Sequence, residues 1–480
     1  MNKNRFFGLT CGIAGVVGAG SCTSTQEKEW DKSPNVIYIL ADDLGIGDIT
    51  PYGQKLIETP NLDRMAAEGM LFTQCYSGTA VSAPSRASLL TGLHTGHTYI
   101  RGNKRIEPEG QMPMPGDTYT IAKMFRDAGY ATSCFGKWGL GYPGSESEPL
   151  KMGFDEFFGY NCQTKAHDYY PDHLWDGEER IDYPDNYNQA EGTYSADIIH
   201  GRARKFIRDN AARPFFAYLS YTLPHAELVL PKDSVYYHYC DIIPAEDDRA
   251  WAEENPQRRG AYGAAERPFA AFAAMVTRLD RYVGDIMEEL DSLGIADNTV
   301  LIFTSDNGPH REGGANPDYF DSYGPYRGIK RELYEGGIRM PMIIRCPGHV
   351  AASSVNDHQM AFWDMMPTFA EIAGATLPCD TDGISFLPSL LGKDGQKEHE
   401  YLYWELHEKG GLQAIRVGDW KGVKLFAGYP DKTRFELYDL STDVHEDNDL
   451  AAQYPDVVEK LKSMMDTVRT DSEIFDFSRL

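Results

Sequence analysis

Four side chains with oxygen donors stand in two short motifs that are far apart in the sequence. Asp42 and Asp43 form the first motif, Asp306 and Asn307 form the second, and each pair follows an apolar run. Three carboxylates brought together repel one another unless a cation joins them, and a set made only of oxygen donors favours calcium or magnesium over zinc. Asp and Asn also favour ordinary turns, so the metal site depends on both motifs meeting in the fold.

A serine at position 82 begins a stretch that can hold an anion. The sequence there reads Ser-Ala-Pro-Ser-Arg from Ser82 to Arg86, with Gly92 one short helix further on. Pro84 suits the first turn of a helix and Gly92 suits its end, so the pattern predicts a helix that begins at Ser82. The backbone N–H groups and the dipole at such a helix start favour a bound anion, and Arg86 lies one turn away.

The elements that must position these residues are short apolar runs, each followed by polar residues. Their content of Val, Ile, Phe and Tyr is typical of buried strands, and amphipathic helical patterns lie between them. This alternation predicts an α/β fold with a doubly wound, mixed and mainly parallel sheet. Ligands of such sheets bind outside the carboxyl ends of the strands, where the polar residues would meet. The runs are residues 36–40, 131–135, 215–219 and 299–304.

Composition divides the chain of 480 residues into four parts. Residues 1–22 have the pattern of a signal peptide with a lipobox, and residues 23–34 that of a polar tether. We expect residues 35–390 to form the large α/β domain, and residues 391–480 a smaller α+β domain with a short antiparallel sheet. Residues 141–209 are acidic and aromatic, which predicts an irregular insertion over the mouth of the site.

The N-terminus predicts an exported protein. Lys3 and Arg5 precede an apolar stretch that is too short to span a membrane, and the residues from Ala19 to Cys22 resemble a bacterial lipobox. We expect lipid on Cys22, as the only attachment to a membrane. An ordinary secretory signal with an incidental cysteine is the alternative.

The net charge of −26 limits the classes of ligand. A protein this acidic has no basic face for the phosphates of nucleic acid, so nucleic acid is excluded as a partner. An anionic substrate would have to be held by local Lys, Arg and metal charges against the field of the whole protein.

Taken together, the motifs resemble those of the type I sulfatases, in which a cysteine or serine is oxidised to formylglycine. The resemblance runs from about residue 35 to residue 466, and it implies an alkaline phosphatase-like fold. The signature is the stretch from Ser82 to Gly92. The other motifs, in order, are Asp42-Asp43, Gly136-Lys137-Trp138, Pro224-His225, Thr304 to Gly308, and Lys330 before Tyr334 to Gly337.

The resemblance also implies an activity and a role for each residue. One hydroxyl of the hydrated formylglycine would attack sulfur, and deprotonation of the other would expel sulfate. One calcium ion would activate this group, and His225 would protonate the leaving alcohol. The implied metal ligands are Asp42, Asp43, Asp306, Asn307 and residue 82 (3-oxoalanine made from Ser82). Charge on the sulfuryl oxygens would be stabilised by Lys137, Lys330 and Arg86.

The sequence departs from the family pattern at two positions. Residue 82 is Ser and not Cys, which implies maturation by the oxygen-independent radical enzyme of anaerobic bacteria. The expected location is therefore the periplasm or outer membrane of a Gram-negative anaerobe. Gly139 stands where many relatives carry His, which leaves more of the proton transfer to His225.

The expected substrate is a sulfated carbohydrate. The motifs look most similar to exo-acting bacterial enzymes that remove the 4-sulfate of galactose or N-acetylgalactosamine. Candidate sugar-binding residues are His167, His173 and His310, and packing in a loop core is the alternative for the first two. A phosphomonoesterase of the same superfamily and a catalytically silent glycan-binding lipoprotein are the rival functions.

Overall fold

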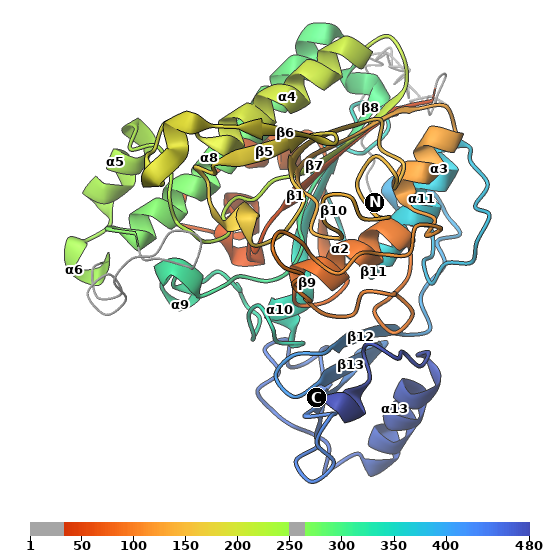
Figure 1. The fold of residues 1–480 in the computed structure, drawn as a ribbon. Helices are drawn as coiled ribbons and strands as arrows, with labels where there is room; N and C mark the ends of the chain where they lie inside the picture. The colour runs from red at the N-terminus through yellow and green to blue at the C-terminus, as the bar shows by residue number, and fades with distance from the viewer. Residues whose placement is uncertain (1–32, 249–264) are drawn as a thin grey trace, which may run out of the picture.

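The computed structural model describes residues 33–248 and 265–480 (Figure 1). The predicted signal peptide, Cys22 and nearly all of the tether lie outside the described residues. No helix in the described part is long and apolar enough to cross a membrane.

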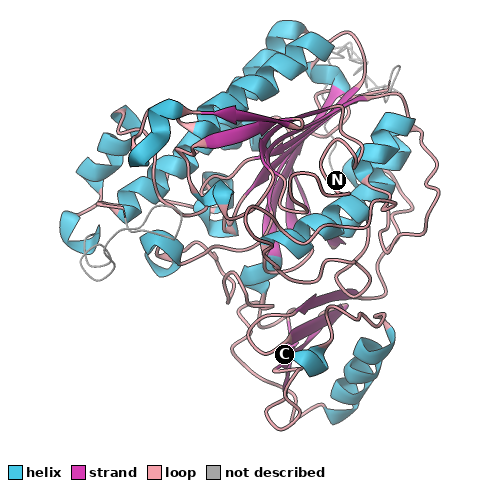
Figure 2. Ribbon diagram, in the orientation of Figure 1, coloured by secondary structure: helices cyan, strands magenta, loops and turns pink. Residues whose placement is uncertain are grey.

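An 11-stranded sheet runs through the larger part of the molecule (Figure 2). Its centre consists of parallel strands, and the predicted runs supply four of them. Every residue of strand β1 (Asn35–Ala41) is buried, as a parallel strand covered on both faces requires. The mainly parallel sheet is thereby confirmed. The central strands, in spatial order, are β8 (Thr299–Ser305), β1 (Asn35–Ala41), β7 (Phe215–Ser220), β3 (Ala131–Lys137) and β4 (Glu156–Tyr160).

Antiparallel pairs make the sheet mixed on both sides of this centre. Beyond β8 lie β9 (Arg339–Arg345), β2 (Met70–Tyr76) and β10 (Ser354–Asn356), and β11 (Met360–Ala361) also pairs with β2. Beyond β4 lie β5 (His173–Asp176) and β6 (Glu179–Asp182).

The segment 141–209 is more regular than its composition predicted. It supplies β4, β5, β6 and helix α4 (Ser195–Asn210), which extend the large sheet and cover it. Tyr169 and Tyr170 are buried in the main core, so these aromatic rings pack inside the protein and do not face a sugar. The expectation of an irregular insertion was wrong, because this much aromatic surface is stabilised by burial.

Helices cover both faces of the sheet (Figure 1). On one face lie α8 (Pro268–Leu293), α4, α5 (Ser234–Ile242) and α1 (Pro60–Ala67), and on the other α2 (Ser82–Thr91), α3 (Ile121–Asp127) and α11 (Met365–Ala373). Alternate residues of β1 enter the two cores, Ile37 and Ile39 on the α8 side and Tyr38 and Leu40 on the other. The short helices are α6 (Ala245–Asp248), α9 (Pro317–Phe320), α10 (Glu335–Ile338) and α12 (Leu387–Leu390), with 3-10 turns η1 (Ile46–Asp48), η2 (Thr50–Tyr52), η3 (Lys165–His167), η4 (Pro184–Gln189), η5 (Ala296–Asn298), η6 (Glu312–Gly314), η7 (Phe362–Asp364) and η8 (Phe477–Arg479).

A second, four-stranded antiparallel sheet forms the C-terminal part, drawn in blue in Figure 1. One face packs against α13 (Pro455–Thr467), and the other shares a core with Tyr76 and Trp363 of the larger part. This agrees with the expected small α+β unit. The strands are β12 (Leu402–Leu406), β13 (Leu412–Val417), β14 (Trp420–Leu425) and β15 (Arg434–Asp439).

Candidate active site

The predicted site residues meet at the carboxyl ends of the central strands. Asp42 and Asp43 follow β1, Asp306 and Asn307 follow β8, and Lys137 is the last residue of β3. These strands are parallel and lie within four positions of one another, so their ends share one edge of the sheet. Ser82 begins helix α2, as predicted, and Gly92 ends that helix in a left-handed conformation.

The oxygen donors form one buried cluster. The Asp43 amide donates to Asp306 Oδ1 at 3.1 Å, and Asn307 Nδ2 donates to Asp43 Oδ1 at 2.7 Å. Asp43 itself has a φ of +62°, a left-handed conformation that turns the chain sharply after β1. The Asn307 Oδ1 atom is buried and accepts no hydrogen bond.

This donor set fits a hard cation. Burial and the neighbouring carboxylate of Asp42 raise the pKa of Asp306 to about 6, although Arg86 opposes the shift. A divalent ion would remove that repulsion and would give the Asn307 oxygen a partner. Carboxylate and amide oxygens are the ligands that calcium and magnesium prefer.

Asp42 and Lys137 hold the position of Ser82. Its hydroxyl donates to Asp42 Oδ1 at 3.1 Å, and Lys137 Nζ lies 3.2 Å from the same hydroxyl and 2.7 Å from Asp42 Oδ2. Burial works against ionisation of Asp42, but Lys137, His225 and Arg86 outweigh it and hold the pKa of Asp42 well below its ordinary value. Burial lowers the pKa of Lys137 despite the adjacent Asp42.

Arg86 contacts the cluster through Asp306. Its Nε and second Nη atom lie 2.9 and 2.8 Å from Asp306 Oδ2, and its other Nη atom donates to Ser220 Oγ and, at 3.3 Å, to the Lys137 carbonyl. The guanidinium is fully buried. These contacts indicate that Arg86 positions Asp306 and the end of β3.

On the other side of the cluster, Lys330 and His225 share one carboxylate oxygen. Lys330 Nζ lies 2.6 Å and His225 Nε2 3.2 Å from Asp43 Oδ2, and the two nitrogens are 3.1 Å apart. His225 Nδ1 faces the carbonyl of Ala226, so Nδ1 carries a hydrogen. Burial and the charge of Lys330 keep the pKa of His225 well below its ordinary value.

The three candidate sugar-binding histidines are placed differently. The ring of His167 stacks on that of His225 with 4.7 Å between the ring centroids. The ring of His310 also stacks on that of His225, with 5.6 Å between the centroids. His173 is buried between Asp172 and Glu109, at 2.9 and 3.0 Å, and these hydrogen bonds do not reach the cluster. His173 was predicted to bind sugar. The structure instead gives it a structural role, because Asp172 and Glu109 hold its ring in a buried position at the start of β5.

Comparison with known proteins is consistent with this geometry. Residues 34–375 match the sulfatase family. The chain belongs to that family. Residues 324–471 also match the C-terminal region of N-sulphoglucosamine sulphohydrolase.

Several relatives of this sulfatase act on sugars. It is 30% identical to an N-acetylgalactosamine-6-O-sulfatase of Bacteroides thetaiotaomicron, over 98% of this chain and 99% of that protein. It is 34% identical to the N-acetylgalactosamine-6-sulfatase of Rattus norvegicus, over 81% of this chain and 71% of that protein. A solved structure of Ps i-CgsB with k-i-k-neocarrahexaose is similar with a TM-score of 0.74 and 28% identity, over 91% and 92% of the two chains. The protein is thus a sulfuric ester hydrolase with an alkaline phosphatase-like sulfatase fold.

The sulfatase has a polar rim that the sequence motifs did not reveal. Asn103 Oδ1 accepts from the Ala83 amide at 3.3 Å and from Gln163 Nε2 at 3.1 Å, directly beside Ser82. Asn103 Nδ2 donates to Glu408 Oε1 at 3.3 Å, and Glu408 Oε2 accepts from Arg331 Nε at 3.1 Å. No local pattern marked these residues; Arg331 adjoins the Lys330 motif, and that adjacency was the only signal.

Gln163 also explains how the sulfatase accommodates Gly139. Gly139 has a φ of +71°, and a Cβ atom there would lie 3.0 Å from the Cγ atom of Gln163. The volume beside residue 139 is therefore filled by the side chain that donates to Asn103. A side chain at residue 139 would therefore require Gln163 to shift.

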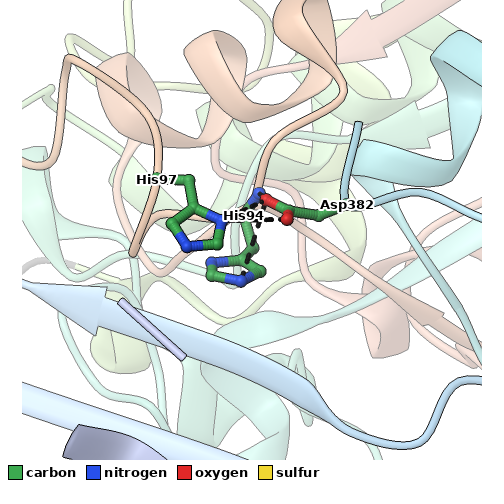
Figure 3. Close-up of side chains that lie close together, drawn as sticks. All are labelled: His94, His97 and Asp382. Carbon is green, nitrogen blue, oxygen red and sulfur yellow. Dashed lines mark hydrogen bonds and ion pairs between the residues drawn. The ribbon is translucent and has the colours of Figure 1, made fainter. Parts of the chain in front are cut away.

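A second group of metal-ligand types, His94, His97 and Asp382, lies at the far end of α2 (Figure 3). His97 Nδ1 lies 2.9 Å from Asp382 Oδ1, and His94 Nε2 lies 3.7 Å from Asp382 Oδ2. The Gly96 amide donates to His94 Nδ1 at 3.1 Å, so in the neutral ring Nε2 carries the hydrogen and has no lone pair for a metal. Burial lowers the pKa of His94 to about 4, against the nearby Asp382. The group ties the chain after α2 to Asp382.

Proposed function

We propose that this sulfatase is an exo-acting glycan sulfatase that removes the 6-O-sulfate of N-acetylgalactosamine. The observation that carries the proposal is the position of Ser82, whose hydroxyl lies between Asp42 and Lys137 at the start of α2. The names of the bacterial and rat relatives favour N-acetylgalactosamine and its 6-sulfate. The 4-sulfate of galactose or N-acetylgalactosamine, which the sequence favoured, stays as the second prediction.

The proposed site binds the sulfate group at Ser82. The side chains of Lys137 and Lys330 lie on opposite sides of the carboxylate cluster, where each can donate to a sulfuryl oxygen. Arg86 has its donors directed at Asp306, Ser220 and a carbonyl, so its part in the proposal is to hold Asp306 in place. Donors fixed in a buried site stabilise developing charge without reorganising.

One calcium ion completes the proposal, held by Asp42, Asp43, Asp306 and Asn307 together with residue 82. When bound, the ion would lower the pKa of the hydroxyl on residue 82 and would polarise a sulfate oxygen. The unpartnered Asn307 oxygen supports an ion at this place.

The proton for the leaving alcohol is assigned to the pair of Lys330 and His225. With a hydrogen on Nδ1 and a depressed pKa, His225 has a lone pair on Nε2, which faces the ammonium of Lys330. In this state Lys330 is the donor and His225 the acceptor. Sulfate binding adds negative charge beside the pair and raises the pKa of His225, so that Nε2 takes up a proton from solvent and gives it to the departing oxygen while Lys330 stays charged.

Maturation and export are further parts of the proposal. Residue 82 becomes formylglycine through the radical maturase of an anaerobic bacterium, and Cys22 carries a lipid that anchors the enzyme in the periplasm or at the outer membrane. Mass spectrometry of the two peptides tests both points. Formylglycine lowers the mass of the Ser82 peptide by two hydrogen atoms, and lipid raises that of the Cys22 peptide.

The function is tested by sulfate release from N-acetylgalactosamine and galactose bearing a 3-, 4- or 6-sulfate. The enzyme is produced with an anaerobic maturase and assayed with and without a chelator, with Ser82→Ala as the inactive control. Release from the 6-sulfate of N-acetylgalactosamine that is lost on chelation supports the proposal. Release only from a 4-sulfate would refute the 6-sulfate specificity and support the second prediction. A converted residue 82 with no release from any of these sugars would refute exo action on these monosaccharides.

A further inference from the structure

We infer that Glu408, supported by Arg331 and Asn103, recognises hydroxyl groups of the sugar and sets the specificity of this sulfatase. This inference rests on the proposed function, because it assigns a sugar contact at the same site. Glu408 belongs to the loop between β12 and β13, so the smaller sheet would contribute to the active site.

Two chains of contacts lead outward from the cluster and meet at Glu408. One begins at the helix start beside Ser82 and runs through the Ala83 amide to Asn103 and on to Glu408. The other begins at Asp43 and passes through Lys330, Glu312 and Arg331 to the second oxygen of Glu408. The first chain starts beside the nucleophile position, and the second leads from a proposed metal ligand through Lys330, which is assigned to the leaving alcohol.

Exposure to solvent increases from Asp43 to Arg331 along the second chain, and Glu408 is also partly exposed. The side chain of Asp43 is 0% exposed, Lys330 4%, Glu312 16%, Arg331 32% and Glu408 25%. The contacts therefore lead from the buried sulfate site to the partly exposed Glu408, and we call this line of residues the wall of the site. A substrate whose sulfate lies at Ser82 and whose leaving oxygen faces Lys330 must have its sugar ring beside this wall.

The loop holds Glu408 in a fixed position. On one side of Glu408, the His407 ring stacks on Phe477 at 4.1 Å, and its Nε2 lies 3.0 Å from Glu405. On the other side, the Gly411 amide donates to the Glu408 carbonyl at 2.9 Å. A recognition group held by its neighbours loses little freedom when a ligand binds.

The contact of Glu408 with Arg331 is not needed to join the two sheets. The two sheets already share an apolar core. The buried Lys421 of the smaller sheet also lies 2.9 Å from Glu335 of the larger part and 2.9 Å from Glu446. Partly exposed ion pairs such as Arg331 with Glu408 contribute little to stability. The placement of a carboxylate and a guanidinium at the mouth is better explained by a ligand.

The chemistry of these groups defines the sugar face that they accept. A carboxylate accepts hydrogen bonds from two neighbouring hydroxyls, and the guanidinium of Arg331 and the amide of Asn103 can donate to a hydroxyl or acetamido oxygen. A second sulfate or a uronic carboxylate on that face would be repelled by Glu408. The inferred substrate is therefore a sulfated sugar residue whose remaining groups at this wall are uncharged.

The kinetic test compares a sugar sulfate with an aryl sulfate that has no hydroxyls. Glu408→Gln should lower kcat/KM on the best sulfated sugar of the panel by about 10- to 100-fold, mainly through KM, because a hydrogen bond to a charged group is lost. The same variant should leave kcat/KM on 4-nitrophenyl sulfate within about twofold. Glu408→Asp should restore part of the loss on the sugar. Lys409→Gln, in the same loop, is the matched control and should leave both substrates unaffected.

A binding measurement tests the inference independently of turnover. The unconverted Ser82 protein is titrated with free N-acetylgalactosamine and, separately, with inorganic sulfate. Glu408→Gln should weaken binding of the sugar and leave binding of sulfate unchanged. An equal effect on both probes, or no effect on the sugar, would overturn the role of Glu408. Failure of the proposed function looks different, since the wild-type enzyme would then release no sulfate from any sugar.

Discussion

The Lys330 ammonium lies 3.1 Å from the Nε2 atom of His225, and both nitrogens contact the same oxygen of Asp43. A lysine ammonium can only donate, so this relationship gives His225 a lone pair on Nε2. The sequence resemblance made His225 the acid for the leaving alcohol. We propose instead that the pair is the proton source, with Lys330 as its charged member.

Replacement of Lys330 by Gln should impair sugar sulfates more than aryl sulfates. We expect kcat on the sugar sulfate to fall by about 10²- to 10⁴-fold, the usual contribution of a positioned proton donor. Nitrophenolate leaves without a proton, so the loss on 4-nitrophenyl sulfate should be much smaller. Steady-state kinetics on both substrates measures the difference. Equal losses on the two would argue that Lys330 only binds sulfate.

Replacement of Asn307 by Ala should weaken calcium binding, because the unpartnered Oδ1 atom is a proposed ligand. Even outer-shell partners of a metal contribute about 10- to 100-fold to affinity, and a direct ligand should contribute at least as much. Calorimetric titration with Ca²⁺ measures the change. His97→Gln, in the group at the far end of α2, is the control and should leave affinity and stoichiometry as in the wild type. Unchanged affinity in Asn307→Ala would remove Asn307 from the ligand set.

Insertion of the family's histidine at Gly139 should lower activity. The new Cβ atom would lie 3.0 Å from Gln163, which would have to move away from Asn103 beside the nucleophile. Gly144 offers a matched control, since it also has a positive φ of +86° but nothing within 4 Å of its Cβ position. Gly144→His should lose similar stability through backbone strain, about 1–2 kcal/mol, and keep its activity. Higher activity in Gly139→His would contradict the role given to Gln163.

Stability should fall as the pH rises from about 5 to 7, and Glu446 should be one cause. Burial and the nearby Glu335 raise the pKa of Glu446 from 4.5 to about 7, in opposition to Lys421. Its protonated form is therefore favoured in the folded state, so its contribution to stability is full below pH 4.5 and is lost as the pH rises through 7. Urea unfolding at several pH values should show a smaller decline in Glu446→Gln than in the wild type. Glu459→Gln, on the exposed side of α13, should keep the full decline.

The sequence alone was sufficient for the central strands and for the meeting of most of the predicted site residues at one edge of the sheet. The run from Val36 to Leu40 predicted β1 because a strand buried on both faces must be apolar throughout. Parallel strands end at one edge, so Asp42 and Asp306 could be placed together without coordinates. The helix start at Ser82 and its end at Gly92 followed from local capping rules.

Only the tertiary structure brought together the residues that we propose to contact the sugar. Asn103, Gln163, Arg331 and Glu408 come from four separate segments, and none has a motif or a period that marks it. His173 looked like a candidate for the same surface, yet its partners Asp172 and Glu109 keep it inside the β5 region. A local sequence pattern predicts the helix or strand to which a residue belongs and the face on which it lies. Contacts between distant loops depend on how whole elements pack, and that information is absent from any short stretch of sequence.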